Sequence, residues 1–274
     1  MCHQHLEDFQ DGSIWLSHSL DINPCDYCLW GLLKETVYYN KPCNLMELEV
    51  ATATVFQCYE VCAAYASKAL LKMDRSATCL FGIRNYGVDI NGYVRHPEKG
   101  LCLWLQQRSA TKQTWPGKWD NMVGGGLSVG YTIMETAIKE AAEEASIPLE
   151  LMKNLRPAGS VSFFFESERG LFPNTEFVFD LELPLDFVPF NSDGEVQCFQ
   201  LLPAMDVLEK VFSPDFKTTS CPVIVDFLIR HGLVSIENEP NLPQVVELLH
   251  VPLQTIYRSC QYQPPATNGQ DISA

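Results

Sequence analysis

The sequence predicts an α/β fold in which one acidic helix lies against a β-sheet. Segments with the apolar pattern of strands stand on both sides of a single strongly helical segment. A glycine-rich loop, residues 124–130, leads directly into that helix. A strand, a loop, a glycine segment and a helix therefore follow one another without interruption, and the other elements are placed relative to this unit.

The predicted helix runs from Ile133 to Ile147. Thr132 is a favourable N-cap, and Glu135 three residues later completes a capping box. Pro148 is expected to end the helix, because proline cannot continue the hydrogen-bond ladder. One arc carries small apolar side chains that let the helix lie close to a sheet: Ala137, Ile138, Ala141, Ala142 and Ala145.

Three carboxylates occupy the adjoining arc of this helix. Glu140, Glu143 and Glu144 are spaced i, i+3 and i+4, and so span roughly 100° of the helix surface. They repel one another, and two of them lie in the last turn, where the helix dipole disfavours anions. A hard divalent cation such as Mg²⁺ or Mn²⁺ would offset both costs. The alternative is a solvated acidic face; the preceding glycine loop favours the metal site.

This segment resembles the signature of the Nudix hydrolases, G-x5-E-x7-R-E-U-x-E-E-x-G-U, in which U is a bulky aliphatic residue. Counted from Gly125, the spacing is intact and the three glutamates fall on the metal-binding positions of the family. Tyr131 replaces the first glutamate, Lys139 the arginine, Ala141 the aliphatic residue and Ser146 the second glycine. Lys139 keeps a positive charge but not the planar guanidinium group, whereas Tyr131 removes a carboxylate.

The segment before the glycines makes the resemblance more specific. Residues 108–121, with the pattern Arg-Ser-Ala-Thr-Lys-x-Thr-x-Pro-Gly-x-x-Asp-Asn, resemble the Nudix subgroup related to the hydrolase part of fungal thiamine pyrophosphokinases. Residues 80–87 and 90–93 resemble the end of the domain of unknown function that precedes it. The resemblance covers residues from about 70 to about 257. It implies a Nudix α/β/α sandwich with a mixed sheet.

The resemblance also implies a reaction, the cleavage of a diphosphate bond with Mg²⁺ or Mn²⁺ as cofactor. Glu140, Glu143 and Glu144 would hold the metal, with Glu140 as the base and Lys139 orienting the carboxylates or binding phosphate. Glu195, in a turn before a later strand, is the candidate fourth carboxylate; a solvated turn residue is the alternative.

The substrate implied by the subgroup is thiamine diphosphate or an oxidised analogue, converted to the monophosphate. An oxidised nucleoside diphosphate, of the 8-oxo-deoxyguanosine type, is the second choice. A third reading, from another class, is a Nudix-fold binding module with weak catalysis because of Tyr131. The candidate substrate-binding residues are Arg108, Lys112, Trp115, Lys118, Gly124 and Gly125.

The cations among these residues would hold phosphate oxygens, with solvated surface as the alternative for the lysines. Trp115 and Trp119 would stack on a heteroaromatic ring, with core packing as the alternative. His231 and His250 have no nucleophile or acid at a telling spacing, and are interpreted as structural.

The first fifty residues differ from the rest. Residues 9–12, 20–31 and 37–42 resemble the C-terminal part of mariner-type transposases, whose catalytic aspartates would correspond to Asp11 and Asp21. Only nine residues separate them, too few to assemble that active site. We interpret the segment as a transposon-derived remnant, fused to an enzyme gene or attached to it by a gene-prediction artefact. Cys25 and Cys28, with His18 and Cys43 nearby in sequence, form a weak zinc candidate, because no second such pair follows.

Four regions are therefore expected: a poorly ordered remnant (1–50), part of an accessory domain (51–88), the hydrolase domain (89–257) and a disordered tail (258–274). Helical pieces are expected within 51–75, where Cys58 and Cys62 would be small core residues. Strands are expected at 79–84, 88–94, 101–106, 159–166 and 175–183, with a hairpin loop at 167–174. Helices are expected at 203–212, 221–231 and 242–257.

The composition of the chain argues against some classes of binding partner and some cellular locations. The formal net charge of −15 argues against attraction to nucleic acid or to an anionic membrane, and an anionic substrate would need local cations or a metal. A DNA-binding role for the first fifty residues is disfavoured for the same reason. No apolar run approaches the roughly 20 residues of a membrane span, and no signal peptide is recognisable. Eleven scattered cysteines favour a reducing compartment, the cytoplasm, with a mitochondrion as the alternative.

Overall fold

The computed structural model describes residues 58–62, 65–127, 129–192 and 194–259. Of these, residues 59–73 and 77–259 form one compact unit. The predictions for the transposase-like segment, including Asp11, Asp21 and the Cys25–Cys28 pair, and for residues 260–274 of the tail, lie outside the described residues.

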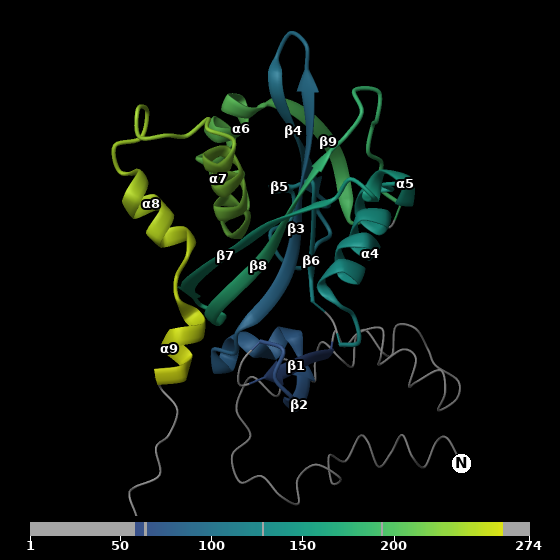
Figure 1. Ribbon diagram of the computed structural model, residues 1–274. Coiled ribbons are helices and arrows are strands. Elements are labelled where there is room, and N and C mark those ends of the chain that lie inside the picture. Colours follow the sequence, from purple (N-terminus) through teal and green to yellow (C-terminus); the bar gives the residue numbers. More distant parts are fainter. Residues whose placement is uncertain (1–57, 63–64, 128, 193, 260–274) are drawn as a thin grey trace, which may run out of the picture. The chain divides into compact units, whose positions relative to one another are not determined.

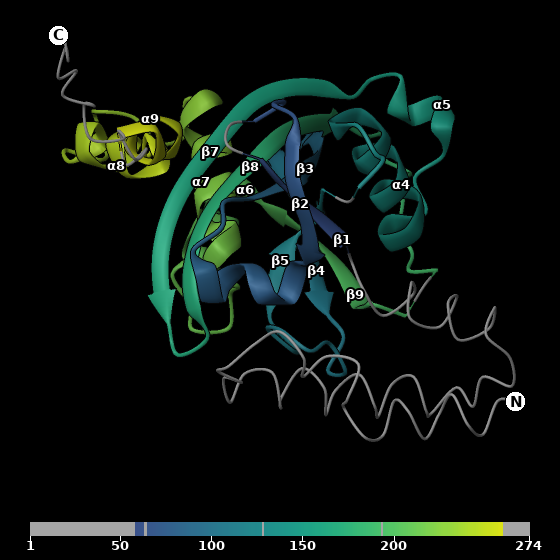
Figure 2. The same cartoon turned by 90° about the horizontal axis from the view of Figure 1, so that it is seen from below.

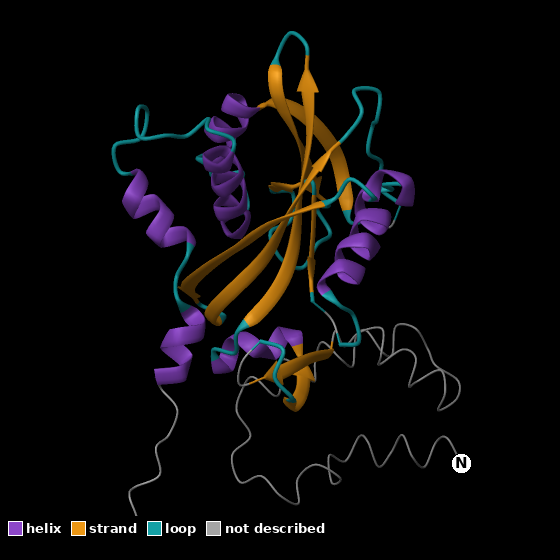
Figure 3. Ribbon diagram, in the orientation of Figure 1, coloured by secondary structure: helices purple, strands orange, loops and turns teal. Residues whose placement is uncertain are grey.

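A mixed β-sheet forms the centre of the unit (Figure 3). In the described part of the chain it has seven strands: β3 (Asn85–His96), β4 (Gly100–Arg108), β5 (Trp119–Asn121), β6 (Val123–Gly126), β7 (Arg156–Ser167), β8 (Gly170–Glu182) and β9 (Val196–Pro203). The strand order is β5-β4-β3-β8-β7, with β6 paired to β3 and β9 paired to β4. β3 and β8 are parallel and the other pairs are antiparallel.

Strand β3 organises this sheet because it has three neighbours. β8 follows it from Asn85 to Tyr93. On its other edge, β6 pairs with Gly87–Ile90 and β4 then pairs with Tyr93–His96. The turn between β3 and β4 lies at residues 97–99. The glycine segment is therefore held directly against the centre of the sheet.

Helices cover both faces of the sheet (Figures 1 and 2). On one face, α4 (Ile133–Ala145) packs through Ala137, Ala141 and Ala145, which are fully buried against Val88, Ile90 and other core side chains; the short helix α5 (Leu149–Met152) follows. On the other face, α6 (Ala204–Val211) and α7 (Cys221–Arg230) pack through a second apolar cluster, and the 3₁₀ turn η2 (Thr218–Ser220) lies between them in the chain. The predicted α/β/α sandwich with a mixed sheet is confirmed.

The start of α4 is the predicted one. The side chain of Thr132 accepts a hydrogen bond from the N–H of Glu135, and the Glu135 carboxylate accepts one from the N–H of Thr132. The helix ends at Ala145, two residues earlier than predicted. Ser146 takes a left-handed conformation, with φ 51° and ψ 40°, and its N–H donates to the carbonyl of Ala141. This residue, rather than Pro148, terminates the helix.

Three predictions before the sheet are wrong. The described part of 51–75 forms a two-stranded sheet, β1 (Cys58–Cys62) and β2 (Ala69–Asp74), instead of helical pieces. The predicted strand 79–84 is instead a 3₁₀ helix, η1 (Arg75–Phe81), and a turn. Gly82 makes that turn possible, because its φ of 59° is readily adopted only by glycine. The strand predicted at 88–94 begins three residues earlier, at Asn85, as part of β3.

Two predictions after α4 also need correction. The connection between β7 and β8 is the two-residue turn of Glu168 and Arg169, so most of the predicted loop 167–174 is strand. The helix predicted at 242–257 is two helices, α8 (Leu242–Leu249) and α9 (Leu253–Ser259). Pro252 separates them, since proline disfavours helical backbone in the preceding residue. The helix α9 includes residues 258 and 259, which had been assigned to the tail.

The other predicted helices are present. α6 ends at Val211 with Phe212 as its C-cap, and α7 is followed by Gly232, whose φ of 70° is typical of a glycine after a helix. None of the described helices is long and apolar enough to cross a membrane.

Candidate metal and diphosphate site

The three predicted metal ligands lie where α4 meets strand β6. Gly125 makes this approach possible: a Cβ atom added there would lie 2.3 Å from Cγ of Glu140. Any larger residue at this position would displace the Glu140 side chain. The glycine segment therefore brings the first carboxylate of α4 against the edge of β6.

Glu144 is the most buried of the three, with 2% of its surface exposed. Its Oε2 accepts hydrogen bonds from the backbone N–H of Gly124 at 2.9 Å and from Nε2 of Gln106 at 3.2 Å. Burial raises the pKa of Glu144 from 4.5 to about 8, and the charges of Asp120 and Glu140 act in the same direction. Without a cation, this carboxyl group is therefore largely protonated at neutral pH.

Glu140 and Glu143 share one cation, Lys139. Its Nζ lies 3.2 Å from Oε1 of Glu140 and 2.6 Å from Oε2 of Glu143. The side chain of Glu140 is 17% exposed. Burial raises the pKa of Glu140, and the negative charges of Glu143 and Glu195 add to this effect against the opposing charge of Lys139. Lys139 thus contacts the two carboxylates, a position that suits the role of orienting them.

The candidate fourth carboxylate lies near this face. Glu195 precedes β9, and its carbonyl accepts a hydrogen bond from the N–H of Ser109 at 2.8 Å. Its carboxylate forms an ion pair with Lys112. The effect of Glu195 on the pKa of Glu140 places its charge within electrostatic reach of α4.

The chemistry of this donor set fits a hard divalent cation, because carboxylate oxygens are the ligands that Mg²⁺ and Mn²⁺ prefer. The pKa values of Glu140 and Glu144 are raised partly by neighbouring carboxylates, a repulsion that a bound cation would relieve. Within the ranges that the structure describes, no three His, Cys, Asp or Glu side chains gather closely enough to hold an ion. Lys139 and Lys112 instead balance the acids, so binding would require these carboxylates to turn toward a shared ion.

The predicted substrate-binding residues are less exposed than expected. Arg108 is buried: its Nη1 donates to Oδ2 of Asp120 at 3.0 Å, and its Nη2 donates to the carbonyl of Thr114 at 2.9 Å. The structure thus gives Arg108 a role in holding the loop that follows β4. Lys118 donates to the carbonyl of Pro214 at 2.7 Å and likewise anchors a loop.

The two tryptophans differ in their surroundings. Trp119 packs at the second apolar cluster, and Nζ of Lys210 lies 4.0 Å from the centre of its ring, so core packing rather than substrate stacking describes it. Trp115 lies in the loop after β4 with a positive φ of 53°, and is half-buried. The ring of His231 stacks on Phe227 with centroids 4.0 Å apart, a packing contact that agrees with its structural interpretation.

Sequence reasoning missed a buried polar network beside this site. Asp120 is 1% exposed and accepts hydrogen bonds from Nζ of Lys217 at 2.9 Å and Oγ of Ser220 at 2.5 Å, in addition to Arg108. Burial alone would raise the pKa of Asp120, but Lys217 and Arg108 outweigh it and the pKa is lowered. Asp120 stood in the Asp-Asn pair of the subgroup pattern, whereas no sequence signal pointed to Lys217.

A second missed acid lies under the glycines. Asp89 is buried on β3 and accepts a hydrogen bond from Nδ2 of Asn121 at 3.0 Å. Burial and the charge of Glu176 raise its pKa well above the ordinary value. Gly124 leaves room for it, since an added Cβ would lie 2.7 Å from Oδ1 of Asp89. The glycine pair therefore accommodates one acid on each face of the sheet.

Comparison with known proteins identifies two regions. The family model of the NUDIX domain matches residues 86–220, and that of a domain of unknown function (DUF4743) matches residues 47–85. The chain is 36% identical over 196 residues to an uncharacterised protein of Saccharomyces cerevisiae, YJR142W, covering 67% of this chain and 57% of that protein.

Two relatives from Arabidopsis thaliana are similar over the same share of this chain. Nudix hydrolase 24, chloroplastic, is 39% identical over 181 residues, 66% of this chain and 49% of the relative. Nudix hydrolase 20, chloroplastic, is 38% identical over 181 residues, which are 66% of this chain and 48% of the relative. The chain thus spans about half the length of these relatives.

Among solved structures, the NUDIX domain of Shewanella oneidensis NrtR is similar with a TM-score of 0.44 and 18% identity, over 59% of this chain and 94% of that one. The match to the family model coincides with the sheet, the glycine segment and the acidic helix described above. Residues 86–220 therefore form a Nudix domain, preceded at residues 47–85 by a domain of unknown function.

Proposed function

We propose that this chain is a metal-dependent hydrolase that cleaves a diphosphate bond. The observation that carries the proposal is the face of α4, where Glu140 and Glu144 contact the glycine segment of a Nudix domain and Glu143 shares Lys139 with Glu140. The names of the two Arabidopsis relatives describe hydrolases of this family. The proposed substrate is thiamine diphosphate or an oxidised analogue, which rests on the subgroup pattern of residues 108–121.

The proposed metal ligands are Glu140, Glu143, Glu144 and Glu195. The ion, Mg²⁺ or Mn²⁺, would polarise the phosphoryl oxygens and lower the pKa of its bound water. The protein supports this with fixed donors: the N–H of Gly124 and the amide of Gln106 hold the Glu144 carboxylate in one orientation. Glu144 must lose its proton to bind an ion, so the affinity should rise with pH.

Glu140 is the proposed general base. Its raised pKa brings it closer to the neutral range, in which a base is both unprotonated and basic enough to accept a proton. Lys139 orients Glu140 and Glu143 through its two ion pairs. Lys112 is the proposed phosphate contact, because a cation bound by Glu195 would release this ammonium group.

The remaining predicted substrate residues take supporting roles in the proposal. Arg108 holds the loop that contains Trp115, and Lys118 ties the end of this loop to the carbonyl of Pro214. Trp115 stays a candidate for contact with the substrate ring. Gly124 and Gly125 act through their missing side chains, by admitting Asp89 and Glu140.

The test is Mn²⁺ titration of the full chain and of the double variant Glu143→Gln/Glu144→Gln, together with a hydrolysis panel. The panel contains thiamine diphosphate, oxidised thiamine diphosphate and 8-oxo-deoxyguanosine diphosphate, the second-choice substrate. We expect the double variant to lose Mn²⁺ binding and phosphate release. Glu150→Gln is the matched control, since Glu150 is an exposed glutamate on α5 that pairs with the exposed Lys153. If the wild-type protein releases phosphate from none of these diphosphates, the proposed hydrolase function is refuted.

A binding module with weak catalysis is the second candidate, favoured by one observation. Tyr131 stands where the signature has its first glutamate and, being 47% exposed, supplies no carboxylate to the α4 face. The variant Tyr131→Glu separates the two functions. A wild-type protein that binds Mn²⁺ and thiamine diphosphate without turnover, and gains turnover in Tyr131→Glu, would establish the binding module.

We further propose a reducing compartment, the cytoplasm, for this protein. Among the described cysteines, Cys62, Cys102, Cys198 and Cys221 are free thiols. The names of both Arabidopsis relatives place those proteins in the chloroplast. Fractionation of cells that express the tagged protein tests this location. Recovery of the protein in an organelle fraction would contradict the proposal.

A further inference from the structure

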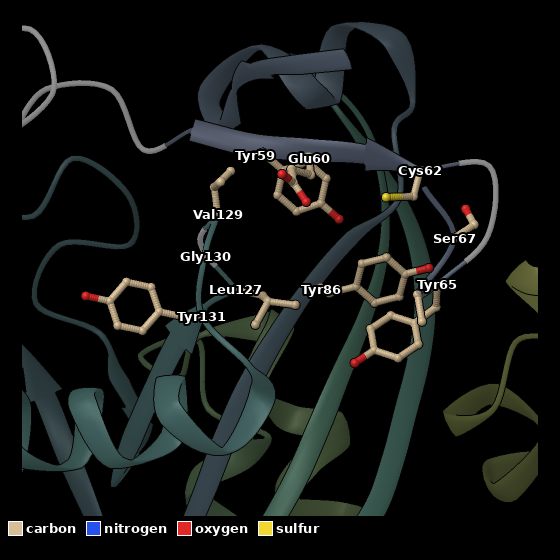
Figure 4. Close-up of a pocket in the computed structure, with 11 residues that line it drawn as sticks. Tyr59, Glu60, Cys62, Tyr65, Ser67, Tyr86, Leu127, Val129, Gly130 and Tyr131 are labelled. Carbon is tan, nitrogen blue, oxygen red and sulfur yellow. The ribbon is translucent and has the colours of Figure 1, made fainter. Parts of the chain in front are cut away.

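A pocket of about 190 Å³ lies beside the glycine loop, on the side of the chain segment that precedes β3 (Figure 4). It is lined by residues from β1, from the turn after it, from the start of β3 and from the loop between β6 and α4. The lining includes four tyrosines, one carboxylate and one leucine: Tyr59, Tyr65, Tyr86, Tyr131, Glu60 and Leu127. None of the proposed metal ligands belongs to this lining.

The aromatic wall of the pocket is held in place by ring contacts. The rings of Tyr65 and Tyr86 have centroids 5.1 Å apart, and Tyr65 lies at the same distance from Phe177. Tyr59 is 4% exposed, and its hydroxyl donates to the carbonyl of Arg84 at 2.5 Å. Figure 4 shows Tyr65 and Tyr86 beside each other, with Leu127 next to Tyr86 and Val129 further away, toward Tyr59 and Glu60. Such a wall suits a flat ring.

The charge of the lining favours a positively charged ring. Among the described residues that line the pocket, the acidic side chain is Glu60, and no lysine or arginine is present. Glu60 pairs with Lys72 at 3.7 Å with both side chains exposed, an interaction worth little that a ligand cation can replace. The guanidinium of Arg84 lies outside the lining and donates to Gln254 of α9. The electron-rich faces of tyrosine attract cations in the same way.

The position of the pocket relates it to the proposed metal site. Glu140 packs on Gly125, and Leu127, which lines the pocket, is two residues further along the chain. In extended backbone this corresponds to about 7 Å. The N–H of Leu127 donates to the carbonyl of Tyr86 at 2.9 Å, so the glycine segment and the aromatic wall are fixed to each other. The pocket therefore adjoins the glycine segment on which Glu140 packs.

We propose that this pocket is a subsite for the ring of the substrate, and that it selects a cationic heteroaromatic ring. This inference rests on the proposed hydrolase function. The volume is below the roughly 300–1,000 Å³ of pockets that hold whole drug-sized ligands, and so fits one ring of a larger molecule. Tyr131, at the position that lost the first signature carboxylate, also belongs to the lining, but its ring points away from the other three tyrosines (Figure 4).

The test compares two diphosphates with the full chain: thiamine diphosphate, and its isostere in which a neutral thiophene replaces the thiazolium ring. We expect kcat/KM for the cationic compound to exceed that for the neutral one by about 5- to 30-fold, the range of a cation on aromatic faces. Tyr65→Ala should reduce this preference to about 2-fold or less, while Tyr65→Phe, which keeps the ring, should preserve it. Tyr65 is exposed enough for both variants to fold.

A calorimetric measurement of the binding of thiamine, which has no phosphate, tests the ring subsite separately from the hydrolase function. Equal turnover of both diphosphates, unchanged in Tyr65→Ala, would overturn the ring subsite and leave the hydrolase in place. Absence of turnover, with thiamine binding that weakens at least 5-fold in Tyr65→Ala and not in Tyr65→Phe, would overturn the hydrolase and support the subsite. Absence of both turnover and thiamine binding would overturn both.

Discussion

Glu144→Gln should stabilise the metal-free protein, and increasingly so at higher pH. The pKa of Glu144 is raised from 4.5 to about 8, chiefly because the carboxyl group is buried. Its protonated form is therefore favoured in the folded state. The corresponding stability is fully present below pH 4.5 and is lost as the pH rises through about 8.

The magnitude follows from this pKa. Each pKa unit is worth about 1.36 kcal/mol, so the wild-type protein should lose up to about 4–5 kcal/mol relative to the variant between pH 4.5 and pH 9. Glutamine has the same shape and keeps an oxygen that can accept from Gly124 and Gln106. The variant should therefore retain the contacts and lack only the charge.

The assay is urea unfolding of both proteins in EDTA at several pH values from 5 to 9. The difference in the free energy of unfolding should be near zero at pH 5 and grow steadily toward pH 9. With saturating Mn²⁺ the order should reverse, because only the wild-type protein gains from the ion. A difference that does not change with pH in EDTA would refute the reasoning about burial.

Three further outcomes are expected. Gly125→Ala should lower turnover at least 10-fold with about 1 kcal/mol or less of stability lost, because the new methyl displaces the flexible Glu140 side chain; equal turnover in a phosphate-release assay would contradict this. Ser146→Gly should raise the free energy of unfolding by about 1 kcal/mol, or the melting temperature by about 2–4 °C, since glycine adopts the left-handed backbone without strain, and Ser146→Ala should not. Asp120→Asn should cost about 3–5 kcal/mol at pH 7 in urea unfolding, because it leaves two buried cations without their anion. The lowered pKa of Asp120 means that its contribution is present above the ordinary value of 3.8 and lost as the pH falls, so the penalty should shrink in acid.

Local patterns explain which parts of the fold were predictable. The start of α4 depends on two side chains three residues apart, Thr132 and Glu135, and the alanines that face the sheet recur with the helical period. The mixed sheet was implied by resemblance rather than by pattern. The early end of α4 was missed because it depends on the backbone conformation of Ser146, which serine rarely adopts.

The errors arose where tertiary contacts override the local signal. Residues 79–84 have the apolar composition of a strand but form a 3₁₀ helix and a turn. In the candidate site, the spacing of the glutamates was visible in the sequence, but the engagement of Arg108 was not. Its partners are the loop carbonyl of Thr114 and the buried Asp120, and Lys217 approaches from a segment almost one hundred residues later. Such long-range pairings leave no short-range pattern.

The central strand also limits how this protein can be divided. The boundary between the two matched family regions, at residues 85 and 86, falls within β3, where Asn85 and Tyr86 pair with Asn174 and Thr175 of β8. A cut at that point would remove only the first residue of β3, Asn85, and would leave the carbonyl of Tyr86, which accepts from the N–H of Leu127, in the second region. The pairing of β3 with β8 begins at Asn85, so a division of this chain that keeps the whole of β3 must be made before that residue.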